Sequence, residues 1–225
     1  MRPVEKGAAP RNYARSGDAR HDLAARIGYY CSYCEMNVTN MIEVEHVVPV
    51  NRGGASLDWE NFLLSCKYCN TVKNNGNAGR GGYAWPDRDN TDLLFDYDEY
   101  GIEVSRTGLT PRQTTAAQST IDLLGLDREP GSAQQPTAGD TRWISRKESW
   151  DKARTSLSNW TTDPVLAMAR QIGITSLDGH YSIWCKVFAN VPDVLREIDQ
   201  AYSRKGLFKQ LGPNNQRIVR QNGII

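Results

Sequence analysis

Four of the five cysteines fall in two closely spaced pairs, and their spacing predicts chemistry more directly than any other feature of the chain. Each pair has the form C-x-x-C: Cys31 with Cys34, and Cys66 with Cys69. A C-x-x-C turn presents two thiolates from neighbouring backbone positions, and two such turns complete the tetrahedral ligand set of a structural Zn²⁺. A redox role would account for one pair but not for two. We therefore expect these four thiolates to bind one structural zinc ion.

The segment between the two pairs, and the residue just after the last cysteine, carry side chains that suit metal-assisted hydrolysis. Glu45 and His46 are adjacent, Asn61 follows after a loop, and Asn70 comes directly after Cys69. Carboxylate and amide oxygens suit a hard cation such as Mg²⁺, which needs few protein ligands because it keeps several waters. An imidazole has its pKa near neutral pH and can accept a proton from an attacking water.

Basic residues in the same region suggest contacts with phosphate. Lys73 lies three residues after Asn70, which places both on one face if the segment is helical. We expect Lys73 to meet a phosphate oxygen, with Arg52 and Lys67 as weaker candidates. A solvated lysine on a helix surface is an equally open interpretation of Lys73.

Around these residues, the pattern predicts strand, loop, strand and helix. Residues 42–48 are rich in β-branched side chains and predict a strand, and a second short strand is expected near 62–64. Gly53 and Gly54 indicate a turn between the two strands, and the segment from Ser65 to Asn75 has no helix breaker. Farther on, Thr110 and Pro111 predict a helix start, and Gly125 its end.

Taken together, the stretch VEHVVPVNRGGASLDWENFLLSCKYCNTVKNN and the preceding CSYCE resemble the HNH endonuclease superfamily, whose fold is the ββα-metal motif. The similarity covers residues 31–75 and belongs to the zinc-stabilised branch of the superfamily. It implies that Glu45 and Asn70 hold a catalytic Mg²⁺ or Mn²⁺, that His46 is the general base, and that Asn61 is a catalytic residue which fixes the loop. It also implies cleavage of DNA to 5′-phosphate and 3′-hydroxyl ends. Glu45 and Asn70 stand where Asp and His are common, but both keep an oxygen donor.

The whole chain also resembles PtuB-like HNH nucleases of Septu-type anti-phage defence systems. The segments that carry this similarity are RPVEKG near the start, WPDRDNT after the motif and GHYSIWCKVF in the C-terminal part. The resemblance implies a defence complex with a PtuA-like partner ATPase.

The C-terminal part has its own helix signals. Ser145 and Glu148 match a capping box, and Asp163 before Pro164 predicts a helix that ends at Gly173. A further helix is expected to end at Gly206. We therefore predict an α+β protein with a zinc-bearing ββα-metal core in residues 1–128, a linker over 129–142, and an all-helical region over 143–225 that suits partner docking.

Composition limits the remaining possibilities. The 225 residues carry 27 Lys and Arg against 26 Asp and Glu, so the net charge of +1 does not by itself indicate a nucleic-acid-binding protein. The apolar runs are too short to cross a membrane, and no secretory signal is evident, so a cytoplasmic protein is expected. Two alternatives to an active nuclease stay open: a non-catalytic zinc module, or an assembly subunit that binds nucleic acid or a partner ATPase.

Overall fold

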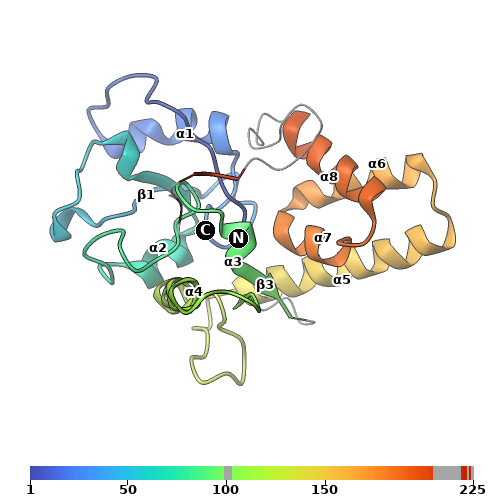
Figure 1. The fold of residues 1–225 in the computed structure, drawn as a ribbon. Coiled ribbons are helices and arrows are strands. Elements are labelled where there is room, and N and C mark those ends of the chain that lie inside the picture. Colours follow the sequence, from blue (N-terminus) through green and yellow to red (C-terminus); the bar gives the residue numbers. More distant parts are fainter. Residues whose placement is uncertain (99–102, 205–218, 222, 224–225) are drawn as a thin grey trace.

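A computed structural model of the chain describes residues 1–98, 103–204, 219–221 and 223 (Figure 1). It is a mixed α/β structure with two small sheets and many helices. The N-terminal part surrounds the cysteines, and the C-terminal helices pack beside it as a second cluster with its own hydrophobic core. Within the described residues, no helix is both long and apolar enough to span a membrane.

The motif region forms the strand, loop, strand and helix that the sequence predicts. Strand β1 (Glu43–His46) pairs antiparallel with β2 (Phe62–Ser65), so that His46 lies opposite Phe62. Helix α2 (Lys67–Lys73) follows at once. Cys66 caps this helix because its sulfur accepts a hydrogen bond from the backbone N–H of Cys69, 3.4 Å away. The second C-x-x-C turn therefore also starts the helix that carries Asn70.

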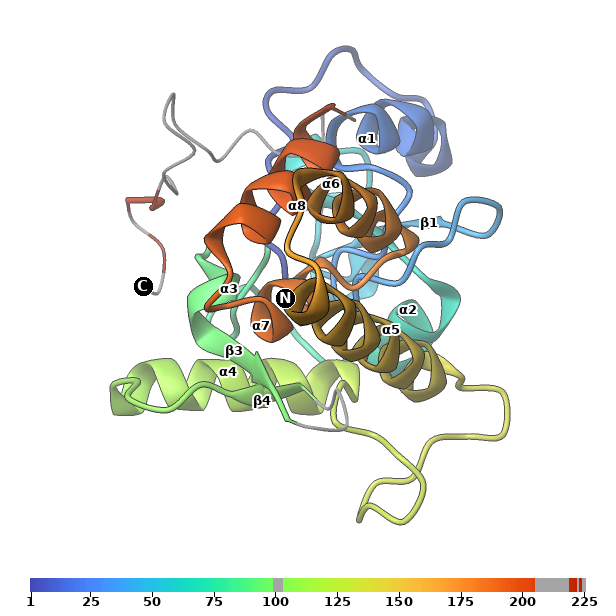
Figure 2. The same cartoon turned by 90° about the vertical axis from the view of Figure 1, so that its right-hand side faces the viewer.

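The rest of the N-terminal part covers this hairpin. A short turn, η1 (Ser16–Ala19), leads into α1 (Arg20–Ile27), and both lie against the hairpin. After the motif come α3 (Thr91–Leu94) and a second hairpin of β3 (Phe95–Tyr97) and β4 (Glu103–Ser105), which Figure 2 shows beside α4 (Pro111–Leu124). The predicted helix over 110–125 is confirmed, with a capping box between Thr110 and Gln113 and a left-handed Gly125 after its end.

Among its described residues, the C-terminal unit contains the α-helices α5 (Arg142–Thr162), α6 (Leu166–Thr175), α7 (Tyr181–Val187) and α8 (Pro192–Arg204), with a 3-10 turn, η4 (Ser176–Asp178), after α6. One face of α8 is apolar and buried, since Val194, Ile198 and Tyr202 belong to the second core. Tyr30 of the N-terminal part joins the same core, and its hydroxyl donates to the backbone oxygen of Leu177. The two parts therefore share packing as well as a chain connection.

Several predicted boundaries in this unit are wrong. Ser145 is not an N-cap, because α5 starts at Arg142 and the Ser145 hydroxyl bonds His180 instead. Helix α6 begins after Val165, so Asp163 does not cap it. Gly173 lies inside α6, where a Cβ would come 2.6 Å from the backbone oxygen of Glu197; close helix packing explains this glycine. The predicted stop at Gly206 lies outside the described residues.

The predicted linker is irregular, as its composition indicates, but its end is anchored. Asp140 is buried, and Arg142, which we expected in an exposed connection, is 1% exposed as the first residue of α5. Arg142 binds Asp140 and also donates to Cys69 and to backbone oxygens at the end of α4, so it ties this segment to the N-terminal part.

Candidate active site

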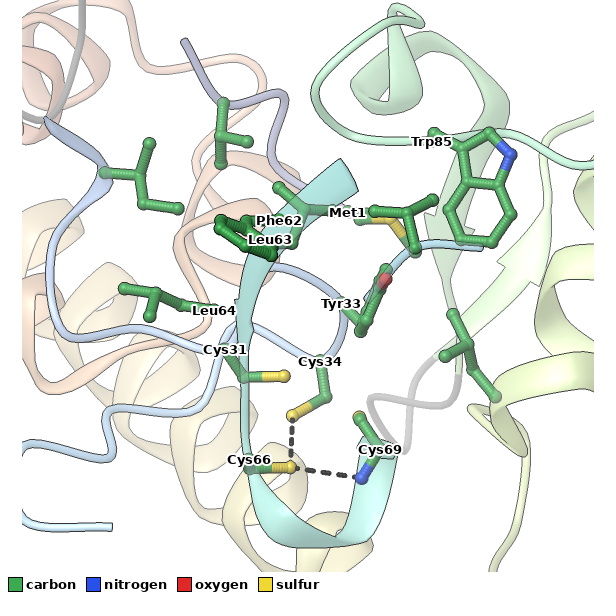
Figure 3. Packing of buried hydrophobic residues seen from close by; sticks show 14 of the residues in the cluster. Met1, Cys31, Tyr33, Cys34, Phe62, Leu63, Leu64, Cys66, Cys69 and Trp85 are labelled. Carbon is green, nitrogen blue, oxygen red and sulfur yellow. Dashed lines mark hydrogen bonds between the residues drawn. The ribbon is translucent and has the colours of Figure 1, made fainter. Parts of the chain in front are cut away.

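The four paired cysteines converge at the start of α2. All are buried, and their sulfur atoms lie within 4.8 Å of one another. The sulfurs of Cys31, Cys34 and Cys66 point toward one another in Figure 3. In a tetrahedral site with Zn–S distances of about 2.3 Å, the sulfurs are about 3.8 Å apart, and Cys34 Sγ and Cys66 Sγ are separated by 3.8 Å. This donor set fits a structural zinc ion.

Ionisation of this cluster is favoured at one sulfur in particular. Burial opposes charge on Cys69, but hydrogen bonds from the other cysteine thiols and the charge of Arg142 lower the pKa of Cys69 well below its ordinary value. Burial and the neighbouring thiols raise the pKa of Cys31, Cys34 and Cys66 instead, so Cys69 is the one sulfur of the four whose thiolate, the form that binds metal, is favoured by its surroundings.

His46 ends strand β1 with its ring held in one orientation. Its edge packs on Phe62, and Nε2 lies 3.0 Å from the backbone oxygen of Ser56. A carbonyl oxygen can only accept, so Nε2 carries a hydrogen, and in the neutral form of the ring this is the one hydrogen on nitrogen. Nδ1 is then left with a lone pair, as a general base requires.

Asn61 fixes the loop that supports this histidine. Its side-chain oxygen accepts from the backbone N–H of Val48 at 2.8 Å, and its nitrogen donates to the backbone oxygens of Val48 and Ala55, each at 2.9 Å. Val48 follows β1 by two residues and Ala55 precedes Ser56, so one amide joins both ends of the loop around His46. This contact agrees with the loop-fixing role expected for Asn61.

Gly54 is required by the same loop. A Cβ at this position would lie 1.9 Å from the backbone oxygen of Val48 and 2.9 Å from the Asn61 amide nitrogen. Any side chain at this position would push the loop away from Asn61.

Glu45 points into the protein and forms a buried ion pair. Its Oε1 lies 2.6 Å from Lys73 Nζ, and its Oε2 accepts a 2.5 Å hydrogen bond from the Tyr33 hydroxyl. Burial raises the pKa of Glu45 above its ordinary value, although the Lys73 ammonium and the Tyr33 hydroxyl favour the carboxylate. A charged carboxylate in this position gains from any additional cation nearby.

The position of Lys73 therefore differs from that expected of a surface lysine that contacts a phosphate. Its side chain is 1% exposed, and its ammonium also donates to the backbone oxygen of His46 at 3.0 Å. A lysine in this position cannot meet a phosphate from solvent unless it leaves Glu45. Arg52 and Lys67, the two weaker candidates, are both exposed.

Asn70 contacts the carboxylate of Glu43, and not that of Glu45, with which we expected it to share a metal ion. Its side-chain nitrogen donates to Glu43 Oε2 at 2.7 Å. Glu43 and Glu45 share one face of β1, and Asn70 and Lys73 share one face of α2, so the two side-chain pairs form side by side. Because a carboxylate can only accept, Glu43 holds the Asn70 nitrogen and leaves the amide oxygen free to bind a cation.

A cleft of about 760 Å³ is lined by residues of β1, of the turn that follows it, and of the second half of α2 and the residues just after it. Glu45, His46 and Asn70 all contribute to its walls, so the structure brings the predicted acid, base and amide to one cleft. Among the described residues that line the cleft, none is a lysine or an arginine; the lining comprises Val44, Glu45, His46, Pro49, Val50, Asn51, Asn70, Thr71, Asn74 and Asn75.

Sequence reasoning gave three residues of this region too little weight. Glu43 shares a face of β1 with Glu45 because side chains of a strand repeat every two residues, and this period is the signal that places it near the same site. Tyr33 lies inside the first C-x-x-C turn and touches Glu45, and Arg142 touches Cys69 from far along the chain. No local pattern pointed to either contact.

Comparison with known families agrees with this geometry. The sequence model described as HNH endonuclease matches residues 31–76, which include both cysteine pairs, β1, β2 and α2. Residues 31–76 are thus similar to the HNH domain of endonucleases. A search of curated proteins found no match to the chain.

Proposed function

We propose that the protein is a metal-dependent HNH endonuclease that hydrolyses phosphodiester bonds of DNA. The observation that carries the proposal is His46, whose ring is fixed by Ser56 so that Nδ1 is the basic atom, in a cleft that it shares with Glu45 and Asn70. The match of residues 31–76 to the HNH endonuclease family supports the same reaction class.

In this mechanism His46 Nδ1 removes a proton from water as the oxygen attacks phosphorus. The bond from phosphorus to the 3′ oxygen breaks, and that oxygen leaves with a proton from solvent, giving 5′-phosphate and 3′-hydroxyl ends. A bound Mg²⁺ or Mn²⁺ supplies charge neutralisation at the phosphate. Asn70, through its amide oxygen, and Glu45 are the proposed ligands, and Asn61 keeps the histidine loop in place.

Cation binding at Glu45 has a structural consequence in this proposal. Both oxygens of Glu45 already have a partner, so a divalent ion bound directly to Oε1 would compete with the like-charged Lys73 ammonium and favour its departure. Lys73 would then be released toward the cleft, where it could approach a phosphate. Arg52, in the turn after β1, and Lys67, the first residue of α2, are both exposed and are the further proposed phosphate contacts.

The decisive experiment is plasmid nicking by zinc-loaded protein with Mg²⁺ or Mn²⁺. We expect His46→Ala to lower the rate about 10²–10⁴-fold, as removal of a general base does. His21→Ala is the matched control, because His21 is exposed and bonds only Tyr29 among the contacts described. Equal rates for the wild type and His46→Ala would overturn the catalytic assignment.

A second candidate, an assembly subunit whose nuclease requires a partner, is favoured by the lack of basic side chains among the described residues of the cleft. DNA binding relies on neutralised phosphates, and the net charge of +1 offers little of this by itself. We propose that a partner ATPase, as in anti-phage defence complexes of the Septu type, supplies the basic surface. Co-purification with such an ATPase, and cleavage by the complex but not by the isolated chain, would support this version.

A further inference from the structure

One residue outside the HNH domain touches the cysteine cluster directly. Arg142, the first residue of α5, donates from Nη1 to Cys69 Sγ at 3.2 Å. Its side chain is 1% exposed, so this contact is shielded from water. The two residues are 73 positions apart, and the family match ends at residue 76. The contact therefore belongs to this chain's C-terminal region and not to the matched domain.

Arg142 is fixed by acceptors on every side. Nη1 also donates to the backbone oxygen of Leu124 at 2.7 Å, and Nη2 donates to that of Gly125 at 3.1 Å. Asp140 binds Nε at 2.8 Å and Nη2 at 2.7 Å. The carbonyls at the end of α4 favour a cation, and the bidentate carboxylate sets the plane of the guanidinium. The N–H directed at Cys69 is thus held in place before any metal binds.

The charge of the cysteine cluster explains why a guanidinium belongs there. Four thiolates around one Zn²⁺ leave a net charge of about −2 in a buried site. Uncompensated charge is costly away from water, whereas a hydrogen bond from a fixed cation stabilises the sulfur. Residues next to metal ligands commonly orient them and alter metal affinity by about 10–100-fold.

We propose that Arg142 is a positioning residue of the zinc centre, which orients the Cys69 thiolate and strengthens zinc retention through an N–H···S hydrogen bond. The C-terminal helical unit would then complete a zinc site whose four ligands all lie in the HNH domain.

A second set of contacts joins the other cysteine turn to the same unit. Glu35, directly after Cys34, accepts from the backbone N–H of Ser182 at 2.8 Å and from its hydroxyl at 2.6 Å. The backbone N–H of His180 donates to the backbone oxygen of Glu35 at 3.0 Å. Glu35 adopts a φ of 63°, which is costly for a non-glycine residue, so these bonds stabilise an otherwise unfavourable turn. Both cysteine turns are therefore held by residues between 142 and 182.

The test measures zinc transfer from the full-length, zinc-loaded protein to a chromogenic chelator. Arg142→Met removes the donors and the charge, and we expect zinc release about 10-fold faster or affinity about 10-fold weaker. Arg142→Lys keeps the charge but cannot donate to sulfur, carbonyls and carboxylate together, and should show an intermediate loss. Asp140→Asn leaves Arg142 in place but loosens its orientation, and serves as the mildest variant if Arg142→Met does not fold.

Arg146 provides the matched control. It is one turn farther along α5 and is 1% exposed, but its described hydrogen bond is to the backbone oxygen of Arg128 at 3.4 Å. Arg146→Met removes a buried arginine without touching a thiolate, so zinc release should stay at the wild-type rate. Replacement of zinc by Co²⁺ adds a spectroscopic signature, because loss of the N–H···S bond shifts the thiolate-to-cobalt charge-transfer band.

The outcomes separate cleanly. Faster zinc release and a shifted cobalt band in Arg142→Met and Asp140→Asn, but not in Arg146→Met, support the proposal. Wild-type release and an unshifted band in the Arg142 or Asp140 variants overturn it, as does an equal change in Arg146→Met. Nuclease activity is not a readout in this experiment, so the result does not depend on the proposed reaction.

Discussion

Lys73 of α2 and Glu45 of β1 form an ion pair of 2.6 Å, and each side chain is 1% exposed. Glu45 directly precedes His46, the last residue of the strand. The Lys73 ammonium also donates to the backbone oxygen of His46, so the pair joins α2 to β1. Removing one partner of a buried pair leaves an uncompensated charge, which typically costs about 3–5 kcal/mol. The pair is thus a structural support of the proposed site as well as a potential ligand.

We therefore predict that Lys73→Met and Glu45→Gln each lower the free energy of unfolding by about 3–5 kcal/mol, and that the double variant loses less than the sum. Urea denaturation with saturating zinc measures both values. The exposed pair of Lys147 and Asp151 is the control, and Lys147→Met should cost less than about 1 kcal/mol. If Lys73→Met or Glu45→Gln lowers the free energy of unfolding as little as Lys147→Met does, the pair does not support the fold.

The contact between Glu43 and Asn70 makes a separate prediction about metal binding. Asn70→Ala removes a proposed ligand oxygen. Glu43→Gln lets Asn70 turn its amide, because a glutamine can donate as well as accept. We expect both changes to weaken Mn²⁺ binding to the zinc-loaded protein, Glu43→Gln by about 10-fold. Titration followed by Mn²⁺ electron paramagnetic resonance reports this affinity without substrate.

Glu148→Gln, an exposed acid on α5, controls for the loss of one negative charge. If Glu43→Gln binds Mn²⁺ like the wild type while Asn70→Ala does not, then Asn70 is a ligand that needs no orientation by Glu43. Unchanged affinity in both variants would remove Asn70 from the proposed ligand set.

A substitution at Gly54 is expected to lower activity by displacing the backbone of the loop after β1. Gly54→Ala places a Cβ against the Val48 carbonyl and must displace the loop that Asn61 fixes. A displacement of about 1 Å in catalytic geometry can cost about 10²-fold in rate, so we expect a drop of that order in nicking activity with zinc retained. Gly81→Ala is the control, since nothing lies within 4 Å of a Cβ built there. Near-normal activity of Gly54→Ala would mean that the loop tolerates displacement.

Local patterns were sufficient to predict the elements of the motif. The β-branched run before His46, the two C-x-x-C turns and the absence of breakers after Ser65 each act over a few residues, and the structure confirms β1, β2 and α2. Thr110 and Gly125 predicted α4 for the same reason, because caps depend on neighbouring backbone groups.

Contacts between distant elements were not predictable in this way. Which acid meets Asn70 depends on how α2 lies across β1, and this offset is set by packing and not by spacing in the sequence. Ser145 had a good capping pattern, but Arg142 extends α5 by burying itself against Cys69, so Ser145 falls inside the helix. Tertiary contacts outweighed local propensity there, since a cap contributes only about 1 kcal/mol.

Asp87 supplies a prediction of pH dependence. It binds Arg80 through both oxygens, at 2.8 and 3.0 Å, and lies 3.3 Å from Lys6 Nζ. Lys6 in turn donates to the backbone oxygens of Trp59 and Phe62, on either side of Asn61. Burial alone would raise the pKa of Asp87, but the hydrogen bonds and charge of Arg80, with the charge of Lys6, lower it below 3.8.

A carboxylate whose pKa is lower in the folded protein stabilises the fold fully above its unfolded pKa of about 3.8, and this stabilisation is lost as the pH falls through the folded value. We predict that the free energy of unfolding of the wild type decreases as the pH falls below about 5. Asp87→Asn should be less stable than the wild type at pH 6, and its free energy of unfolding should decrease less as the pH falls. Urea denaturation across this range measures both.

Asp163→Asn, which changes an exposed carboxylate, is the control. Acid also releases zinc from thiolates, in wild type and variants alike, so the comparison between them isolates Asp87. Parallel curves for wild type and Asp87→Asn would show that this carboxylate does not stabilise the segment around Asn61.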